Sequence, residues 1–205
     1  MARRKAAEER RENAERAREL LSSGRPPRDR RAARFLVSAL QSAVFNHVLE
    51  ARIDHYDEVR IGDRARGEEG GGLYWVDDLE RDRERAKRFE ISATGPIFGT
   101  KMRQPQGEIE GLERAAYEAY GVPAPGELRL PRGIRARGTR RPLRISPEGL
   151  SIDPLDTGDG FRLVCALPPG AYVTVLLDEL VGRGRVSEGH RAAKAPVESP
   201  TPAVS

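Results

Sequence analysis

Apolar residues recur at spacings of three and four along residues 30–53, which predicts an amphipathic helix with one broad buried face. Asp29 precedes this segment and can accept hydrogen bonds from the first backbone amides, so it is the expected N-cap. His47 falls on the apolar face, where a lone histidine is more often a packed core residue than a ligand or a base. The expected buried stripe consists of Phe35, Leu36, Ala39, Leu40, Ala43, Val44, His47, Val48 and Ala51.

The segments after this helix alternate between short strand patterns and helical patterns. Glycines between residues 62 and 72 favour turns, so a loop is expected there. Further helices are predicted at 77–87, 107–120 and 172–181, and strands at 59–61, 73–76, 90–94, 143–145, 150–152 and 161–167. This mixture of helices and short strands predicts an α+β fold.

The two ends of the chain differ from its centre. Residues 2–21 are helix formers with almost no apolar stripe, which predicts an exposed helix. From residue 182 the chain is rich in Pro, Ala and Ser without periodicity, which predicts a disordered tail. The 205 residues therefore suit one domain with appendages.

Several function classes are excluded by motif and composition. Pro168, Pro169 and Gly170 interrupt the longest apolar stretch, so no membrane span is expected, and the basic start lacks the apolar core of a presequence. A cytoplasmic location follows as an expectation. Cys165 is the only cysteine and lies in a strand pattern, so neither a disulfide framework nor a zinc site is expected. The segment GPIFGTKM lacks the spacing of a Walker A motif, which argues against nucleotide hydrolysis.

Basic residues are grouped along the chain, although the net charge is only +4. Residues 1–34 hold 12 Lys and Arg against 6 Asp and Glu, which is compatible with either an anionic partner or a solvated, arginine-biased face. Residues 129–144 hold seven arginines and no acidic residue. Because these charges repel one another, a phosphate-bearing partner is the simpler explanation of the second group.

Five segments in order resemble the TruD family of tRNA pseudouridine synthases, over about residues 34–182. RFLVSALQSAVFNHVLEARI is similar to the family's SAxQSxxFN helix, and EISATGPIFGTKM, followed by Gly107 and Glu113, is similar to its TGPxFGxKM segment. The others are GD at 62–63, RGTRRPL at 137–143, and FRLVCALPPGAYVTVLLDEL at 161–180, which looks like the closing motif. The resemblance implies an RNA isomerase without a cofactor. In that reaction an aspartate attacks a flipped uridine, the N1–C1′ bond breaks, and the base rejoins through C5.

The resemblance also implies a domain organisation. Residues 1–33 would form a basic exposed helix and linker, and 34–155 an inserted TRUD domain of mixed helices and strands. Residues 156–182 would supply a strand and a helix of the pseudouridine synthase catalytic domain, and 183–205 the tail.

One departure from the family pattern concerns the nucleophile. The family carries its catalytic Asp in a GxKDxxA segment, followed by NYFGxQRFG, and this sequence contains neither a Lys-Asp dipeptide nor NYFG. Every aspartate is expected in a loop or on a charged helix face. The chain is therefore expected to lack the front half of the catalytic domain and to make no pseudouridine alone. A misplaced start of a longer reading frame, a fragment, and one half of a split enzyme whose catalytic Asp lies on a separate N-terminal polypeptide are the alternatives that the sequence leaves open. The rival hypotheses are a non-catalytic RNA-binding remnant and a helix-rich interaction protein.

Candidate substrate contacts follow from residue type and resemblance. A flipped base needs an apolar or aromatic wall, and Tyr172 matches the aromatic residue of the closing motif, although it is equally typical of a core residue. Gln41, Ser42 and Asn46 lie within two turns of one helix and could form a polar network, or Asn46 could hold a loop.

Arginine's planar fork suits phosphate oxygens, and Arg140 and Arg141 precede a proline that favours extended backbone. These two, with Arg137, Lys101 and Arg103, are the predicted RNA contacts. Asp178 and Glu179 are adjacent on a helix and cannot face each other, so solvent or a salt bridge is expected for them.

Overall fold

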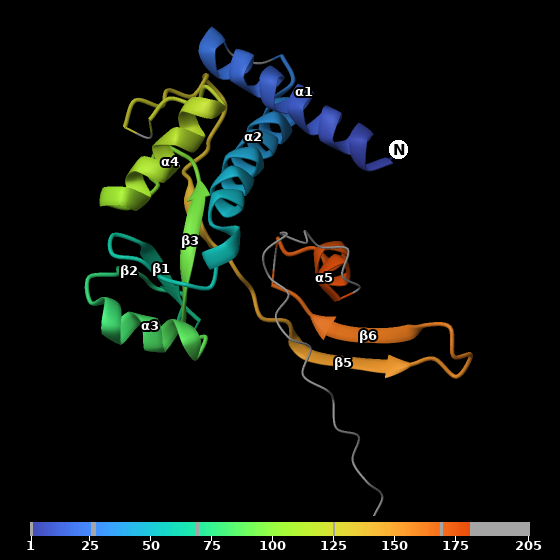
Figure 1. Ribbon diagram of the computed structural model, residues 1–205. Helices are drawn as coiled ribbons and strands as arrows, with labels where there is room; N and C mark the ends of the chain where they lie inside the picture. Colours follow the sequence, from blue (N-terminus) through green and yellow to red (C-terminus); the bar gives the residue numbers. More distant parts are fainter. Residues whose placement is uncertain (1, 26–27, 69, 125, 169, 181–205) are drawn as a thin grey trace, which may run out of the picture. The chain divides into compact units, whose positions relative to one another are not determined.

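The computed structural model in Figure 1 describes residues 2–25, 28–68, 70–124, 126–168 and 170–180. The chain divides into two compact units, which meet in sequence between Arg144 and Ile145. Both units contain helices and strands, which confirms the α+β class. The side chains of Asp178 and Glu179, and the tail beyond residue 180, lie outside the described part.

Two long helices open the first unit (Figure 1). α1 spans Ala2–Ser23 and α2 spans Arg30–Ala51, and they pack against each other. The Asp29 side chain caps α2 by accepting hydrogen bonds from the amides of Arg31 at 2.8 Å and Ala32 at 3.1 Å, as predicted.

The expectation that the first helix is exposed is wrong for its second half. Ala14, Ala17 and Leu21 are buried, and their spacing of three and four residues places them on one face of α1. Small side chains let two helices approach closely, so a stripe that consists mostly of alanine is sufficient here. The pattern of large apolar residues along the sequence does not reveal such a stripe.

α2 buries a wider surface than its apolar stripe predicted. It packs against α1, against α4 (Gly107–Ala119) and against strand β3 (Ile91–Ile97). Phe35, expected inside, is 62% exposed, whereas Phe45 is buried against the sheet. His47 is half-buried and packs edge-on against Tyr120, with ring centroids 5.8 Å apart. The buried residues of α2 are Ala33, Val37, Leu40, Val44, Phe45 and Val48.

A four-stranded antiparallel sheet forms the other layer of the first unit, in the order β2-β1-β3-β4. The strands are β1 (Arg64–Gly67), β2 (Leu73–Trp75), β3 and β4 (Thr139–Pro142). Residues 91–96 of the central strand β3 are all buried. In the register between β3 and β4, Pro96 lies opposite Arg140 and Gly95 opposite Arg141.

Two strand predictions in this region are wrong. Residues 59–61 form no strand, and the expected glycine loop contains β1, because pairing with β2 and β3 stabilises a segment whose own sequence is polar. The strand predicted at 143–145 instead runs from Thr139 to Pro142. The predicted helix near residues 77–87 is α3, spanning Leu79–Lys87, with Asp78 as its N-cap.

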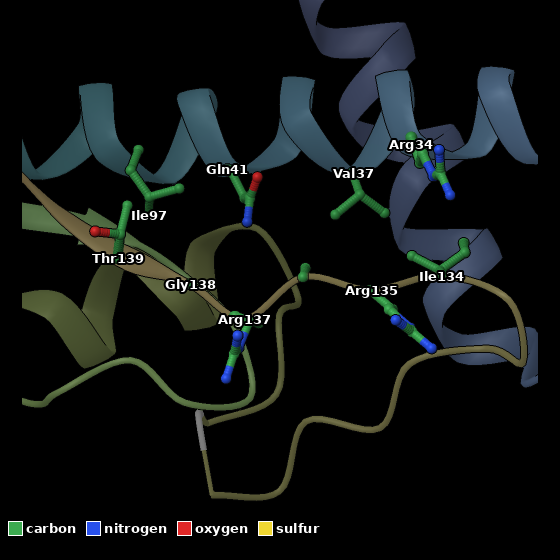
Figure 2. A pocket seen from close by; sticks show the side chains of 10 residues that line it. Arg34, Val37, Gln41, Ile97, Ile134, Arg135, Arg137, Gly138 and Thr139 are labelled. Carbon is green, nitrogen blue, oxygen red and sulfur yellow. The ribbon is translucent and has the colours of Figure 1, made fainter.

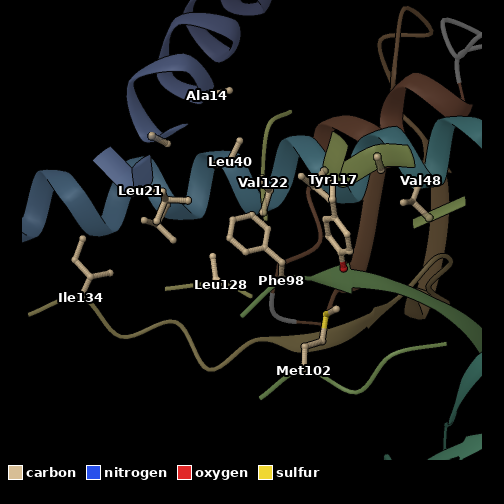
Figure 3. Packing of buried hydrophobic residues seen from close by; sticks show 14 of the residues in the cluster. Ala14, Leu21, Leu40, Val48, Phe98, Met102, Tyr117, Val122, Leu128 and Ile134 are labelled. Carbon is tan, nitrogen blue, oxygen red and sulfur yellow. The ribbon is translucent and has the colours of Figure 1, made fainter. Parts of the chain in front are cut away.

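Two clusters of buried side chains hold the first unit together. One lies between α1, α2, α4 and the segment around Phe98, and Figure 3 shows Phe98, Tyr117 and Leu40 converging there. The other joins Phe45 of α2 to the sheet and α3. Helix α2 contributes to both clusters, so it couples the helical layer to the sheet.

The second unit is an antiparallel hairpin followed by a helix. Its elements are β5 (Glu148–Pro154), β6 (Phe161–Ala166) and α5 (Val173–Leu180). Pro154 pairs with Phe161, so the domain boundary expected at residue 155 falls in the turn of this hairpin, and that domain division stays a prediction. No helix in the described ranges is long and apolar enough to cross a membrane.

Candidate nucleic-acid interface

The cluster of seven arginines at 129–144 is divided by the fold into buried and exposed members. Arg140 is 1% exposed, and its guanidinium forms a two-point ion pair with Glu113, with Nη1 3.0 Å from Oε2 and Nη2 in contact with Oε1. Its Nε and Nη2 also donate to the hydroxyl and carbonyl of Thr94, at 2.8 and 2.7 Å. Every donor that could reach a phosphate is therefore occupied inside the protein.

The prediction that Arg140 contacts RNA is wrong. The proline after Arg141 does favour extended backbone, but side chains alternate between the two faces of a strand. In β4 this alternation turns Arg140 into the core, where a glutamate from α4 meets it. Burial raises the pKa of Glu113, although the Arg140 guanidinium beside it acts in the opposite direction.

Arg141 and Arg144 lie partly inside the unit. Arg141 is half-buried with its guanidinium 5.3 Å from the Phe45 ring, and its role in RNA binding stays a prediction. Arg144 donates to the carbonyls of Ala86 and Ile91 at 2.5 and 2.9 Å, and burial lowers its pKa. Thus the uncompensated charge inferred from the sequence is partly compensated by groups distant in the chain.

Three exposed members of the cluster, Arg129, Arg135 and Arg137, line two clefts on either side of residues 134–137. The first cleft, of about 340 Å³, is lined by Arg34, Val37, Gln41, Ile97, Ile134, Arg135, Ala136, Arg137, Gly138 and Thr139 (Figure 2). The second, of about 610 Å³, is lined by Thr100, Lys101, Gly126, Leu128, Arg129, Leu130, Ile134, Arg135, Ala136 and Arg137. None of the aspartates and glutamates in the described part of the chain lines either cleft. We call the exposed Arg34, Lys101, Arg129, Arg135 and Arg137 the basic surface.

Two glycines hold the parts of this surface together. Gly138 has φ +78°, and a Cβ on Gly99 would lie only 2.2 Å from the Gly138 amide nitrogen, so the two backbones touch. Beside this contact the amides of Thr100 and Lys101 donate to the carbonyls of Ala136 and Arg137, at 3.0 and 2.7 Å. Lys101 and Arg137, which are far apart in sequence, therefore lie next to each other.

The predicted polar residues of α2 and the predicted RNA contact Arg103 do not form one cluster. Gln41 lines the first cleft, and its Nε2 donates to the Phe98 carbonyl at 2.6 Å. Ser42 and Asn46 are exposed, and their side chains make no hydrogen bond with the described residues, so the predicted network is reduced to Gln41. Arg103 is exposed. Its backbone carbonyl accepts a hydrogen bond of 3.3 Å from Nη1 of Arg140.

Tyr172 lies in the second unit, directly before α5, and is 69% exposed. Its assignment to the wall of a uracil pocket stays a prediction.

Two aspartates are buried, although Asp63 lies in a loop and Asp82 on the charged helix α3, the two kinds of location that the sequence predicted. Asp63 is fully buried, and its two carboxylate oxygens accept from Arg52 at 2.6 and 3.0 Å and from the Arg60 amide at 2.8 Å. Asp82 is fully buried beside Arg81 and Arg85. Their carboxylates are engaged in ion pairs, which is a structural role. Within the described ranges, no group of three His, Cys, Asp or Glu side chains is arranged to hold a metal ion.

Arg34, Arg129 and Arg135 were not singled out by sequence reasoning. The available signal was the grouping of basic residues at 1–34 and 129–144. That signal does not identify which members stay at the surface, because the fold brings the start of α2 beside residues 134–137.

The comparison with known families gives a direct match to this region. The family described as tRNA pseudouridine synthase D (TruD) matches residues 26–180, which include the start of α2, both clefts and α5. The chain belongs to the TruD family. The resemblance seen in the five sequence segments is thereby confirmed.

TruD proteins of several bacteria are similar to the chain. tRNA pseudouridine synthase D of Geobacter metallireducens is 44% identical over 157 residues, which cover 76% of this chain and 38% of that protein. The protein of the same name from Thermus thermophilus is 38% identical over 150 residues, covering 72% and 40%. The chain spans about two fifths of the length of these relatives.

A solved TruD structure shares the fold. The chain matches the structure from Methanosarcina mazei with a TM-score of 0.56 and 22% sequence identity, covering 74% of this chain and 38% of that one.

The glycine contact allows a direct test of how the basic surface is assembled. We expect Gly99→Ala to lower the free energy of unfolding by about 1–3 kcal/mol, the usual cost of overpacking, because the new methyl group meets backbone atoms that cannot move aside. Urea unfolding followed by circular dichroism measures the change.

Gly111→Ala is the matched control, since a Cβ there meets nothing within 4 Å and the residue lies inside helix α4. That substitution should raise stability by about 0.4–1 kcal/mol. Equal stabilities of the two variants would contradict the assigned contact.

Proposed function

We propose that this chain supplies part of a tRNA pseudouridine synthase of the TruD type, which isomerises uridine in tRNA without a cofactor. The match of residues 26–180 to the TruD family carries this proposal. The basic surface supports it, because an RNA substrate brings phosphates that exposed arginines and lysines bind. A cytoplasmic location belongs to the same proposal.

The chemistry requires a carboxylate at the flipped uridine, and this chain offers no suitable one among its described side chains. The carboxylates of Asp63 and Asp82 are held in ion pairs. None of the other described aspartates follows a lysine, as the catalytic Asp does in the family's GxKDxxA segment. We therefore propose that the nucleophile comes from a separate polypeptide with the GxKDxxA and NYFG segments. Tyr172 would then form a wall of the uracil pocket.

The second unit supports association with such a polypeptide. Its hairpin and helix expose large apolar side chains, and a two-stranded sheet of this kind needs a covering layer or further strands to be stable. The exposed fractions lie between 41% and 69% for Leu150, Ile152, Phe161, Val164, Tyr172 and Val175. We propose that the missing strands of the catalytic domain cover these residues.

The test is reconstitution. Unmodified tRNA is incubated with this chain, with a polypeptide that carries the two missing segments, and with both, and pseudouridine is quantified by mass spectrometry. We expect product in the mixture only, because neither polypeptide alone combines the nucleophile with a complete pocket.

Product from this chain alone would refute the assignment of the nucleophile to a second polypeptide. RNA binding without product in the mixture would instead indicate a non-catalytic RNA-binding protein. As a control, the second polypeptide is also supplied with its catalytic Asp replaced by Asn, which should abolish product.

A further inference from the structure

The basic surface contains three arginines, Arg34, Arg129 and Arg135, besides the predicted RNA contacts Lys101 and Arg137. Arg34 from α2 joins Arg135 and Arg137 around the first cleft, and Lys101 and Arg129 extend the charge along the second. Within the described residues, Arg34, Arg135 and Arg137 take part in no ion pair. This separates them from Arg140, whose charge is neutralised by Glu113.

The ligand class follows from these charges. Three guanidinium groups that form no ion pair with the described carboxylates bind a polyanion favourably, and planar guanidinium forks match phosphate oxygens. Apolar side chains also line both clefts, among them Val37, Ile97, Leu128, Leu130 and Ile134, but they carry no charge, so the arginines decide the charge of the ligand. A chain of phosphates is therefore the partner that this surface fits.

The side chains between the arginines indicate which form of RNA is bound. Among the described side chains, no Phe, Tyr, Trp or His lines either cleft, and the exposed Phe35, which follows Arg34, lines neither of them. Proteins that bind unpaired RNA stack its bases on aromatic rings, whereas double-helical RNA is recognised through its phosphates and 2′-hydroxyls. This surface has the composition of a duplex-backbone site.

We propose that the basic surface, with Arg34 and Arg135 as its new members, binds the sugar–phosphate backbone of double-helical RNA. The inference rests on the proposed function, since the RNA would be a paired arm of the tRNA substrate. A flipped base stacks on aromatic or apolar side chains, and no described aromatic side chain lines these clefts, so the surface acts on a different part of the RNA from the target base. It would orient the tRNA without reading its sequence.

The test compares two double variants that each remove two positive charges. Arg34→Ala/Arg135→Ala changes the basic surface, and Arg83→Ala/Arg114→Ala removes two exposed arginines from α3 and α4 that line neither cleft. The probes are an RNA hairpin whose stem covers one helical turn and an oligouridine of the same length. Affinity is measured by fluorescence anisotropy over a series of salt concentrations, and circular dichroism verifies folding.

We expect the wild-type chain to prefer the hairpin to the oligouridine. In Arg34→Ala/Arg135→Ala, hairpin affinity should fall about tenfold or more at low salt, and the slope of log affinity against log salt should decrease by about one to two units. The control variant should retain most of the wild-type slope.

Two results would overturn the inference. Equal losses of slope in the two double variants would show that only total charge matters, and an oligouridine bound as well as the hairpin would exclude a duplex site. The reconstitution assay separates this failure from failure of the proposed function. A mixture that makes pseudouridine while Arg34→Ala/Arg135→Ala binds normally rejects only the inference, and duplex binding without pseudouridine rejects only the function.

Discussion

Replacing Arg140 by Ala is expected to lower the free energy of unfolding by about 3–5 kcal/mol, because it leaves a buried charged partner behind. Glu113 is 1% exposed and would lose both of its hydrogen bonds from the guanidinium. The Thr94 carbonyl would lose a donor as well. Chemical denaturation followed by circular dichroism measures the loss.

The pH dependence of this variant has a defined sign. Burial already raises the pKa of Glu113, and removing Arg140 removes the main influence that lowers it. A carboxyl group whose folded pKa exceeds its unfolded pKa holds its proton longer in the folded state, so stability decreases as pH rises between the two values. The loss of unfolding free energy in Arg140→Ala relative to the wild type should therefore be smaller near pH 4 than near pH 7. An ordinary carboxyl group has a pKa of about 4.3, so the unfolded state begins to lose its proton in this pH range.

Two further variants separate this ion pair from general effects of charge. Arg137→Ala removes an exposed arginine from the adjacent segment and should change stability by less than about 0.5 kcal/mol. Arg140→Met combined with Glu113→Leu removes both charges and should recover most of the stability. A single Arg140→Ala variant that is as stable as Arg137→Ala would contradict the buried ion pair.

Replacing Asp63 by Ala is expected to cost about as much, roughly 3–5 kcal/mol, since Arg52 would be left buried without its carboxylate. Among the described residues the Arg52 Nε already has no hydrogen-bond partner, and of the described acceptors only the Glu58 carbonyl, 3.0 Å from Nη2, would remain. The Arg60 amide would also lose its acceptor at the turn that leads into β1. Thermal unfolding by calorimetry measures the change.

Asp54→Ala is the matched control, because Asp54 is exposed on the short helical turn at Ile53–His55. It should shift stability by less than about 0.5 kcal/mol. A similarly small effect of Asp63→Ala would show that the pair contributes little.

Much of the helical structure is determined locally by the sequence. The limits of α2 follow from its apolar periodicity and the Asp29 cap, and α3 follows from the Asp78 cap and its charged residues. These features depend on neighbours within one or two turns, and so can be read without the fold. The five segments that resemble TruD, and the order in which they occur, could likewise be recognised from the sequence alone.

The strands depended more strongly on their partners. β1 is a polar segment that ends in glycine. It becomes a strand because the backbone groups of β2 and β3, on its two sides, form hydrogen bonds with it. α1 is buried through Ala14 and Ala17, whose contribution depends on how closely another helix approaches. Neither property is encoded within one segment.

The charged residues of the candidate site show the same division between what the sequence determines and what the tertiary structure decides. The sequence determined that arginines are concentrated at 129–144, and this correctly indicated a cationic region. Only the tertiary structure decided that Arg140 meets Glu113, 27 residues away in the chain, and that Arg34 lies beside Arg135. Ion pairs and clefts depend on distances in space, which are set when strand alternation and helix packing bring remote segments together.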